Sequence, residues 1–337
     1  MQKKRFTLLT TSICLVLFAL SCKQHKEKNI PKIFPVEKHL KATILPFDFI
    51  IARESCTIAD DCLIFISRGT DTLIYVFSLP EIELINSFGT NGKGPDEFAA
   101  PPSFIKNNSD LLCLSGNSNL SLLKCFEIDK NSKTVTLLKE YSLKDISFLD
   151  LRNLHIINDS ILFYFECVPY KMQIGSYDLM QEKRIASKEI EVNEEHEQMI
   201  EYFNIGFLMA NSQTLTYSYL YQDKIDFMHP DFSLINAIKD ENSKVYIDDS
   251  WVNNQSIIYY TAGYAGREKF YFLYSGCGVN EIAEGGKNRS IEVFDNKGIP
   301  LVKYYLDFPI YEFTVDEKNN KLYGWYDDDD VILVYEL

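Results

Sequence analysis

The sequence feature that most constrains the fold is a β-hairpin that recurs along the chain. Its clearest copy is Ser290–Asp307, in which Asp295, Asn296 and Lys297 form a turn with Gly298. Glycine can adopt the positive φ that a tight hairpin turn requires. Weaker copies and a final half copy follow the same pattern at Ile74–Phe88, Leu122–Leu143, Ile174–Val192, Ile225–Ile238 and Val331–Leu337. Repetition of one hairpin indicates a repeat architecture.

The spacing of these copies predicts the kind of repeat. The central aromatic residues of the copies are Phe77, Phe126, Tyr177, Phe227, Phe294 and Tyr335. The first three intervals are 49, 51 and 50 residues, close to the ~40–50 residues of a four-stranded propeller blade. The fourth interval, 67 residues, predicts an insertion in the fifth blade. We therefore expect an all-β fold, a six-bladed β-propeller with four-stranded blades.

The two ends of the repeat region indicate how the ring closes. The last hairpin copy is short, because the chain stops after Val331–Leu337. The strand-like segment Leu40–Phe49 belongs to no hairpin of its own. Pairing of these two segments would supply the missing strand of the last blade and remove an exposed sheet edge. We expect this pairing to close the ring.

The N-terminal residues are typical of an export signal. Lys3, Lys4 and Arg5 precede the apolar run Phe6–Leu20, so residues 1–21 are predicted to be a secretion leader. The sequence Ala19-Leu20-Ser21-Cys22 resembles the lipobox of bacterial lipoproteins, although these usually have Leu where Ala19 stands. The resemblance implies lipidation of Cys22, a flexible tether over residues 22–39 and a propeller over residues 40–337.

This leader also predicts a location. A lipidated Cys22 would anchor the protein in the cell envelope, and the segment Lys23–Lys26 lacks an acidic run that would favour surface display. The expectation is an outer-membrane lipoprotein facing the periplasm. The alternative is ordinary cleavage of the leader and release of a soluble exported protein.

Two sets of motifs resemble known propellers. The loop Phe88-Gly89 to Phe98, with Gly92-x-Gly94-Pro95-x-Glu97-Phe98, resembles the blade connection of NHL-type six-bladed propellers. Further motifs, including Ile291-x-Val293-Phe294-Asp295 and Leu322-Tyr323-Gly324, are similar to the TolB-like six-bladed propeller lipoproteins of Gram-negative bacteria. The resemblance covers nearly the whole mature chain. It implies a fold and transfers no catalytic residues, because its motifs are structural.

Composition excludes one class of partner. Aromatic residues make up 14% of the chain, mostly Tyr and Phe, as expected of a β-rich core. The formal net charge is −14. Such a surface repels phosphate backbones, so nucleic acid is not an expected partner.

The cysteines allow disulfides in an exported protein. Cys56 and Cys62 flank the turn at Asp60–Asp61 and could bond across a hairpin. The other reading is that both are small buried hydrophobes. Cys113, Cys125, Cys167 and Cys277 are expected to be buried hydrophobes, because none has a Cys-x-x-Cys or metal-ligand spacing.

One segment favours a helix. Asn193 can cap a helix over Glu194–Tyr202, whose first turn carries acidic residues. It would lie between the third and fourth blades.

The sequence contains few patterns that indicate catalysis or metal binding. The histidines His25, His39, His155, His196 and His229 are scattered without metal-ligand spacing, and we expect none to be catalytic. The run Asp327–Asp330 is interpreted as a solvated turn rather than a calcium site. No catalytic residue, metal or cofactor is predicted.

A binding face is predicted instead. In a propeller the loops between second and third strands meet the blade crossings at one end of the central channel. The candidate ligand-binding residues are Arg68, Lys93, Tyr170, Lys171, Tyr221, Gln222, Arg267 and Arg289.

Two functions fit this face. The first is a non-enzymatic, membrane-tethered module that binds a peptide, a glycan or an envelope protein. The second is an envelope hydrolase or lyase with an active site in the central channel, using acidic residues and Arg267 or Arg289 near the fifth-blade insertion.

Overall fold

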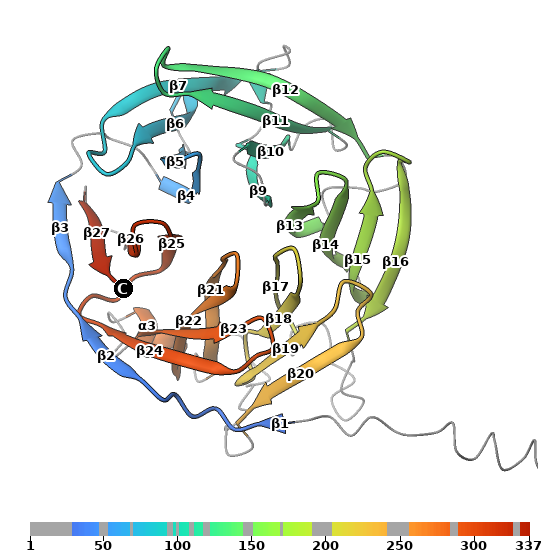
Figure 1. The fold of residues 1–337 in the computed structure, drawn as a ribbon, viewed down its shortest axis with the longest axis vertical. Coiled ribbons are helices and arrows are strands. Elements are labelled where there is room, and N and C mark those ends of the chain that lie inside the picture. The colour runs from blue at the N-terminus through green and yellow to red at the C-terminus, as the bar shows by residue number, and fades with distance from the viewer. Residues whose placement is uncertain are drawn as a thin grey trace, which may run out of the picture.

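The computed structural model describes most of the chain as β-strands arranged around a common axis (Figure 1). The described residues are 29–46, 53–67, 70–92, 97–98, 101–107, 111–116, 122–143, 151–168, 171–190, 204–240, 256–283, 289–325 and 331–337. The fold is an all-β propeller. The predicted helix at Glu194–Tyr202 and the run Asp327–Asp330 lie outside the described residues.

The first sheet is an antiparallel meander with one short addition. Its strands are β4 (Arg53–Ala59), β5 (Cys62–Ser67), β6 (Thr72–Ser78), β7 (Leu84–Asn91) and β8 (Glu97–Phe98). The addition, β8, pairs in parallel with β7. Phe98 is buried beside Gly89, as expected for an aromatic residue that fills the space at a blade connection.

The second sheet contains eight strands, which divide into two antiparallel meanders. One meander is β9 (Ser103–Asn107), β10 (Leu112–Gly116), β11 (Leu122–Asp129) and β12 (Thr134–Ser142). The other is β13 (Leu151–Ile157), β14 (Ile161–Val168), β15 (Lys171–Asp178) and β16 (Lys183–Glu189). A short parallel contact between β9 and β13 joins them, with Lys106 opposite His155.

The next two sheets each carry an extra outer strand from the N-terminal segment. The strands of one sheet are β17 (Gly206–Ala210), β18 (Leu215–Tyr219), β19 (Lys224–Met228), β20 (Leu234–Lys239) and β1 (Asn29–Ile30). Those of the other are β21 (Ile257–Ala265), β22 (Lys269–Gly278), β23 (Ser290–Asp295), β24 (Pro300–Leu306) and β2 (Glu37–Leu40). The short helix α3 (Val279–Ala283) follows β22, where the sequence predicts an insertion.

The last sheet joins the two ends of the chain. It contains β25 (Glu312–Asp316), β26 (Lys321–Trp325), β27 (Val331–Glu336) and β3 (Thr43–Pro46). β3 is antiparallel to β27, with Thr43 opposite Val334 and Pro46 opposite Val331. The expected contact between Leu40–Phe49 and Val331–Leu337 is therefore present over the residues of β3.

The repeated hairpin is the outer pair of strands in each meander. In the clearest copy, Val293 lies opposite Val302, and Gly298 has a φ of +79°. A Cβ at Gly298 would lie 2.7 Å from the Phe227 ring, so close packing as well as the turn requires glycine.

The predicted tether is partly wrong. Residues 29–30 and 37–39, which were expected to be flexible, lie in β1 and β2, and these strands pair in parallel with β20 and β24. The physical reason is that β20 and β24 would otherwise expose unpaired backbone groups at the rim, and the N-terminal segment covers them.

Of the two readings of Cys56 and Cys62, the one without a disulfide between them holds. In the register of β4 and β5, Cys56 lies opposite Phe65 and Cys62 opposite Ala59, so the hairpin does not bring the two sulfur atoms together. The expectation that Cys113 and Cys125 are only buried hydrophobes is wrong, because they form a disulfide. They are direct partners on β10 and β11, with a Cα–Cα distance of 4.1 Å.

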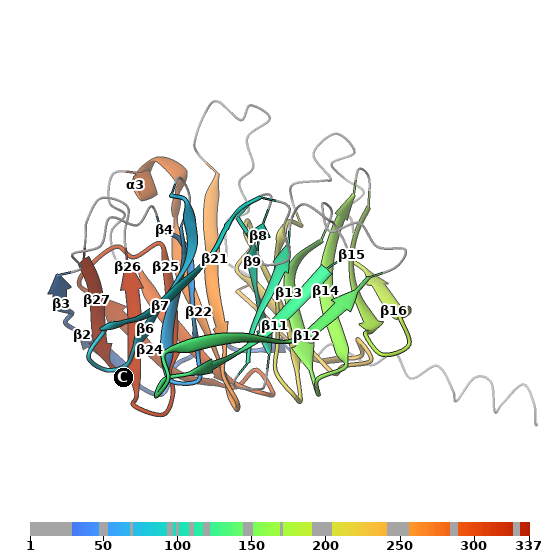
Figure 2. The same cartoon turned by 90° about the horizontal axis from the view of Figure 1, so that it is seen from above.

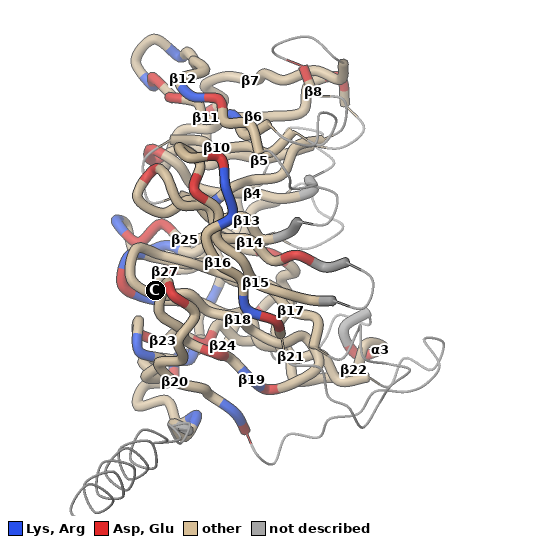
Figure 3. The backbone as a smooth tube through the Cα atoms, turned by 90° about the vertical axis from the view of Figure 1, so that its right-hand side faces the viewer, with Lys and Arg blue, Asp and Glu red and all other residues tan. Residues whose placement is uncertain are grey.

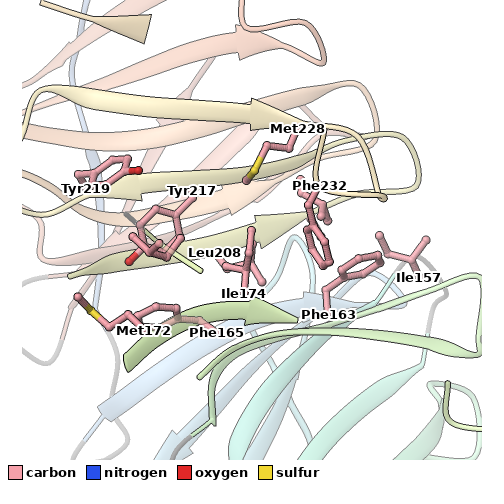
Figure 4. Close-up of a cluster of buried hydrophobic side chains, with 13 residues drawn as sticks. Ile157, Phe163, Phe165, Met172, Ile174, Leu208, Tyr217, Tyr219, Met228 and Phe232 are labelled. Carbon is pink, nitrogen blue, oxygen red and sulfur yellow. The ribbon is translucent and has the colours of Figure 1, made fainter. Parts of the chain in front are cut away.

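The hydrophobic core lies between neighbouring sheets. In Figure 4, Phe163 and Ile174 from the sheet containing β14 and β15 meet Tyr217 and Phe232 from the sheet containing β18 and β19. Burial of one such aromatic side chain contributes about 1.5–3 kcal/mol. Similar clusters fill the other gaps between sheets, so the sheets form a rigid frame.

Candidate functional site

The first strand of each meander lies nearest the axis (Figure 1). Each of these strands contacts the next in the order β4, β9, β13, β17, β21 and β25, and β25 returns to contact β4. Side chains on these strands therefore decide whether the axis is open or filled.

Lys106 on β9 is a cation at this axis. Its Nζ donates a hydrogen bond to the carbonyl oxygen of Gly263 on β21, at 3.1 Å, and lies 4.7 Å from the ring centre of Tyr264. Burial lowers the pKa of Lys106 to about 8, and the Glu312 carboxylate and Cys56 only partly oppose this effect. At pH 7 roughly a tenth of the side chain is then uncharged.

The cavity beside Lys106 is small. Its volume is about 50 Å³, and its walls come from β4, β9, the start of β10 and the end of β21. The side-chain amide of Asn107 in this wall is already hydrogen-bonded, because its Nδ2 donates to the Leu111 carbonyl oxygen at 2.7 Å. Such a volume accommodates one or two water molecules. This cavity is therefore too small for a peptide or a glycan.

His155 on β13 is buried beside Lys106. Its Nε2 lies 3.1 Å from the carbonyl oxygen of Leu208, which fixes this nitrogen as the donor, and Nδ1 has no hydrogen-bond partner. Burial, followed by the charge of Lys106, lowers the pKa of His155 to about 3. The imidazole is therefore neutral at physiological pH.

Arg289 lies at the end of the sheets that carries α3. It immediately precedes β23, and its side chain is buried, with 2% of the residue exposed. Its Nη1 donates a hydrogen bond to the Ile310 carbonyl oxygen, and its guanidinium carbon lies 4.5 Å from the ring centre of Tyr311. Burial lowers the pKa of Arg289, while Tyr311 and Cys277 raise it.

Tyr221 and Gln222 lie in the turn between β18 and β19, at the same end. Both are half-buried. The Gln222 Nε2 donates to Asn204 Oδ1 at 2.7 Å, and burial raises the pKa of Tyr221. The backbone of Tyr259, near the start of β21, donates to the Leu220 carbonyl oxygen, which fixes this turn against the next sheet.

The opposite end of the propeller is held by contacts between turns (Figure 2). Asn211 donates from Nδ2 to the carbonyl oxygens of Gly266 and Arg267 and to Asn296 Oδ1. The Arg267 backbone nitrogen donates to Glu317, and Lys318 donates to Asp61 at 2.6 Å. Many of the charged residues in Figure 3 also lie at these turns, on the side away from α3. Polar groups at this end thus hold neighbouring sheets together.

Residues 34–318 match the family model described as TolB-like 6-blade propeller-like. The chain belongs to this family. The resemblance found in the motifs of the sequence is thereby confirmed.

Solved structures agree with the TolB-like fold at low sequence identity. A member of the DUF4221 family from Bacteroides vulgatus is 13% identical with a TM-score of 0.58, over 88% of this chain and 97% of that one. A Bacteroides fragilis protein predicted to be exported is also 13% identical, with a TM-score of 0.55, over 89% of this chain and 98% of that one.

Part of a much longer protein is also similar in structure. Raptor of Chaetomium thermophilum is 12% identical with a TM-score of 0.50 over 88% of this chain, which spans only 29% of Raptor. Comparison with curated proteins finds no match. The similarity establishes the fold of this TolB-like propeller and transfers no activity.

The structure places only part of the predicted binding face. Arg68, Lys93 and Tyr170 lie outside the described residues, and Lys171 begins β15 opposite Val168. Tyr221, Gln222 and Arg289 lie at the α3 end, as the propeller geometry predicts.

Arg267 does not belong to this group. It lies in the turn before β22, whereas Arg289 lies beyond the far end of that strand. β22 is 10 residues long, which separates its ends by roughly 30 Å. The hypothesis that placed Arg267 near the fifth-blade insertion is wrong, because the insertion follows β22 and Arg267 precedes it.

Sequence reasoning missed Lys106 and Tyr311. Lys106 follows Phe104 and Ile105 in a short strand, and a lysine in such a run was the available signal. Tyr311 carries no motif and is recognised only through its contact with Arg289.

Among the described residues, no group of three or more His, Cys, Asp or Glu side chains could hold a metal ion. Within the same residues no helix has the length and apolar character needed to cross a bilayer.

Proposed function

We propose that this TolB-like propeller is an exported binding module that holds its ligand at the α3 end. The observation that carries the proposal is the group of polar side chains at that end. The half-buried Tyr221 and Gln222 lie in one turn there. The buried Arg289, with two guanidinium nitrogens that have no hydrogen-bond partner, lies beside β23.

The size of the cavity beside Lys106 supports the same reading. Among the described residues, Lys106 and Tyr264 line a cavity of about 50 Å³ between the inner strands. A peptide or glycan is too large for this cavity, and loops on a rigid frame commonly carry binding residues. Arg68, Lys93, Tyr170 and Lys171 remain proposed contacts on this face.

The ligand class is a peptide, a glycan or an envelope protein. A mixture of tyrosine, amide and guanidinium groups suits all three, and the net charge of −14 disfavours nucleic acid. The similarity to a Bacteroides fragilis protein predicted to be exported supports a location in the envelope. The lipobox-like sequence before Cys22 supports a lipid anchor on this residue. We propose that the anchor holds the protein in the outer membrane, facing the periplasm.

We also infer a ring of six four-stranded blades closed by β3. The family description, the cycle of contacts from β4 through β25 and the pairing of β3 with β27 support this count.

The test is capture of ligand from envelope extract, followed by rebinding of the purified ligand. The variant Tyr221→Ala/Gln222→Ala should lose at least tenfold in affinity for the purified ligand. The matched control Gln213→Ala/Arg267→Ala alters the opposite end and should bind as the wild type does. Unchanged affinity of the first variant, or equal loss in the control, would contradict the proposed face.

A second candidate is an envelope hydrolase or lyase with its active site in the channel. The specific observation that favours it is Lys106, an amine with a pKa lowered to about 8 beside a cavity. Its test is turnover of envelope glycans or peptides that is lost in Lys106→Met and retained in Tyr221→Ala/Gln222→Ala.

A further inference from the structure

Arg289 is a buried cation whose hydrogen-bonding capacity is only partly used. Nη1 donates to the Ile310 carbonyl oxygen, while Nε and Nη2 have no hydrogen-bond partner. In the part of the chain that the structure describes, no carboxylate forms an ion pair with this side chain. The guanidinium is thus fixed at one nitrogen and unsatisfied at two.

Such an arrangement is costly in the absence of an anion. Burial of an unpaired charge disfavours the folded state, and a buried donor without an acceptor adds to the cost. Arginine does not relieve the cost by losing its proton, because its pKa lies far above neutral. The structure therefore retains a positive charge where an anion would stabilise it.

The two unsatisfied nitrogens define the shape of that anion. Nε–H and Nη2–H lie on one edge of the planar guanidinium and point in parallel directions, which matches two oxygen atoms of a carboxylate. Ile310 holds the opposite edge, and the Tyr311 ring covers one face of the group at 4.5 Å. The donor edge is therefore held in a fixed orientation.

The group lies close to the surface. Tyr311, which covers the guanidinium, is itself partly exposed. Arg289 is at the α3 end, with the half-buried Tyr221 and Gln222 at the same end of the sheets. A ligand bound at that end can therefore place a charged group one side chain below the surface.

We propose that the Nε and Nη2 edge of Arg289 is a subsite for a ligand carboxylate, which accepts two parallel hydrogen bonds and neutralises the buried guanidinium. This inference rests on the proposed binding function, because it assigns a chemical class to the ligand at the same end. The carboxylate belongs to a peptide C-terminus or to an acidic sugar, and the experiment separates these two sources.

The direct test is NMR of the Arg289 Nε–Hε resonance during titration with sodium acetate, against sodium chloride at equal ionic strength. We expect a saturable shift with acetate and none with chloride. Arg289→Lys keeps the positive charge but lacks the two parallel N–H donors, and should weaken acetate binding at least tenfold. Arg184→Lys is the matched control, because Arg184 already pairs with Glu166 through two nitrogens, and should leave the affinity unchanged.

The wild-type titration keeps the proposal testable even where a variant folds poorly. Equal shifts with acetate and chloride, or wild-type acetate affinity in Arg289→Lys, would overturn the carboxylate subsite. In the second arm, N-acetylalanine, which represents a peptide C-terminus, and glucuronate, which represents an acidic sugar, replace acetate. The compound that binds more tightly identifies the source of the carboxylate. Loss of acetate binding leaves the capture experiment with Tyr221→Ala/Gln222→Ala unaffected, so failure of the subsite and failure of the binding face are distinguishable.

Discussion

Lys32 Nζ lies 2.7 Å from Asp223 Oδ1, although 191 residues separate them in the chain. Lys32 belongs to the segment between β1 and β2, and Asp223 precedes β19. The same ammonium lies 2.9 Å from Glu292 Oε2 on β23 and 3.8 Å from the ring centre of Tyr274. This lysine therefore fastens the N-terminal segment to two neighbouring sheets.

Removal of this lysine should destabilise the propeller. Lys32→Met leaves Asp223 and Glu292, whose side chains are 2% and 0% exposed, without their shared cation. Breaking a buried ion pair from one side costs about 3–5 kcal/mol. Urea unfolding of the two proteins measures the difference. The control Lys130→Met removes a half-exposed partner of Asp61 and should lower the free energy of unfolding by less than about 1 kcal/mol. Similar losses of stability in both variants would count against a special role for Lys32.

His155 should make stability depend on acid. Its pKa is about 3 in the folded protein, against an ordinary value of 6.5. Between these two values the unfolded chain binds a proton that the folded protein does not, so the free energy of unfolding should fall as the pH drops from 6.5 toward 3. His155→Gln should lose part of this dependence. Urea titrations across that range test it, and parallel curves for both proteins would show that His155 does not contribute.

Lys106 should affect stability on the alkaline side. The pKa of its amine is about 8 in the folded protein and ordinarily 10.5. In this interval the unfolded chain holds more protons, so the contribution of Lys106 to the free energy of unfolding should rise with pH. Lys106→Met should remove this rise between pH 8 and pH 9, where unfolded tyrosines, with an ordinary pKa of about 10, remain mostly protonated. A wild-type curve that stays flat relative to the variant would contradict the prediction.

The Cys113–Cys125 disulfide should stabilise the sheet that contains β10 and β11. The bond spans 12 residues, and closure of a loop of about this size contributes about 3 kcal/mol. Cys113→Ala/Cys125→Ala should therefore melt at a lower temperature than the oxidised protein. Calorimetry with and without reductant provides the check, since reductant should lower the melting temperature of the wild type and leave the double variant unchanged.

Local sequence patterns were sufficient for the outer hairpins. Asp295 and Gly298 specify a turn through their own conformational preferences, and the alternating residues around them specify strands. The resemblance to TolB-like propellers then followed from motifs of this local kind. Arg289 was predicted from sequence to contact a ligand, but as an exposed loop residue rather than as a buried guanidinium.

Pairings between distant segments were less predictable. Cys113 and Cys125 are partners because of the register of β10 and β11, and a shift of one residue would have turned one sulfur to the other face. Lys32 illustrates the same limit, because its lysine-rich surroundings are typical of a solvated segment, whereas the carboxylates that bury it come from β23 and from the turn before β19.

The sequence by itself determined the repeating hairpins, the turns that end them and the pairing expected between the chain ends, because backbone conformation and alternation of side chains act over a few residues. Only the tertiary structure decided which charges are buried and which cysteines bond. Burial and ion pairing depend on the approach of sheets that are far apart in the chain, and that approach has no local signature.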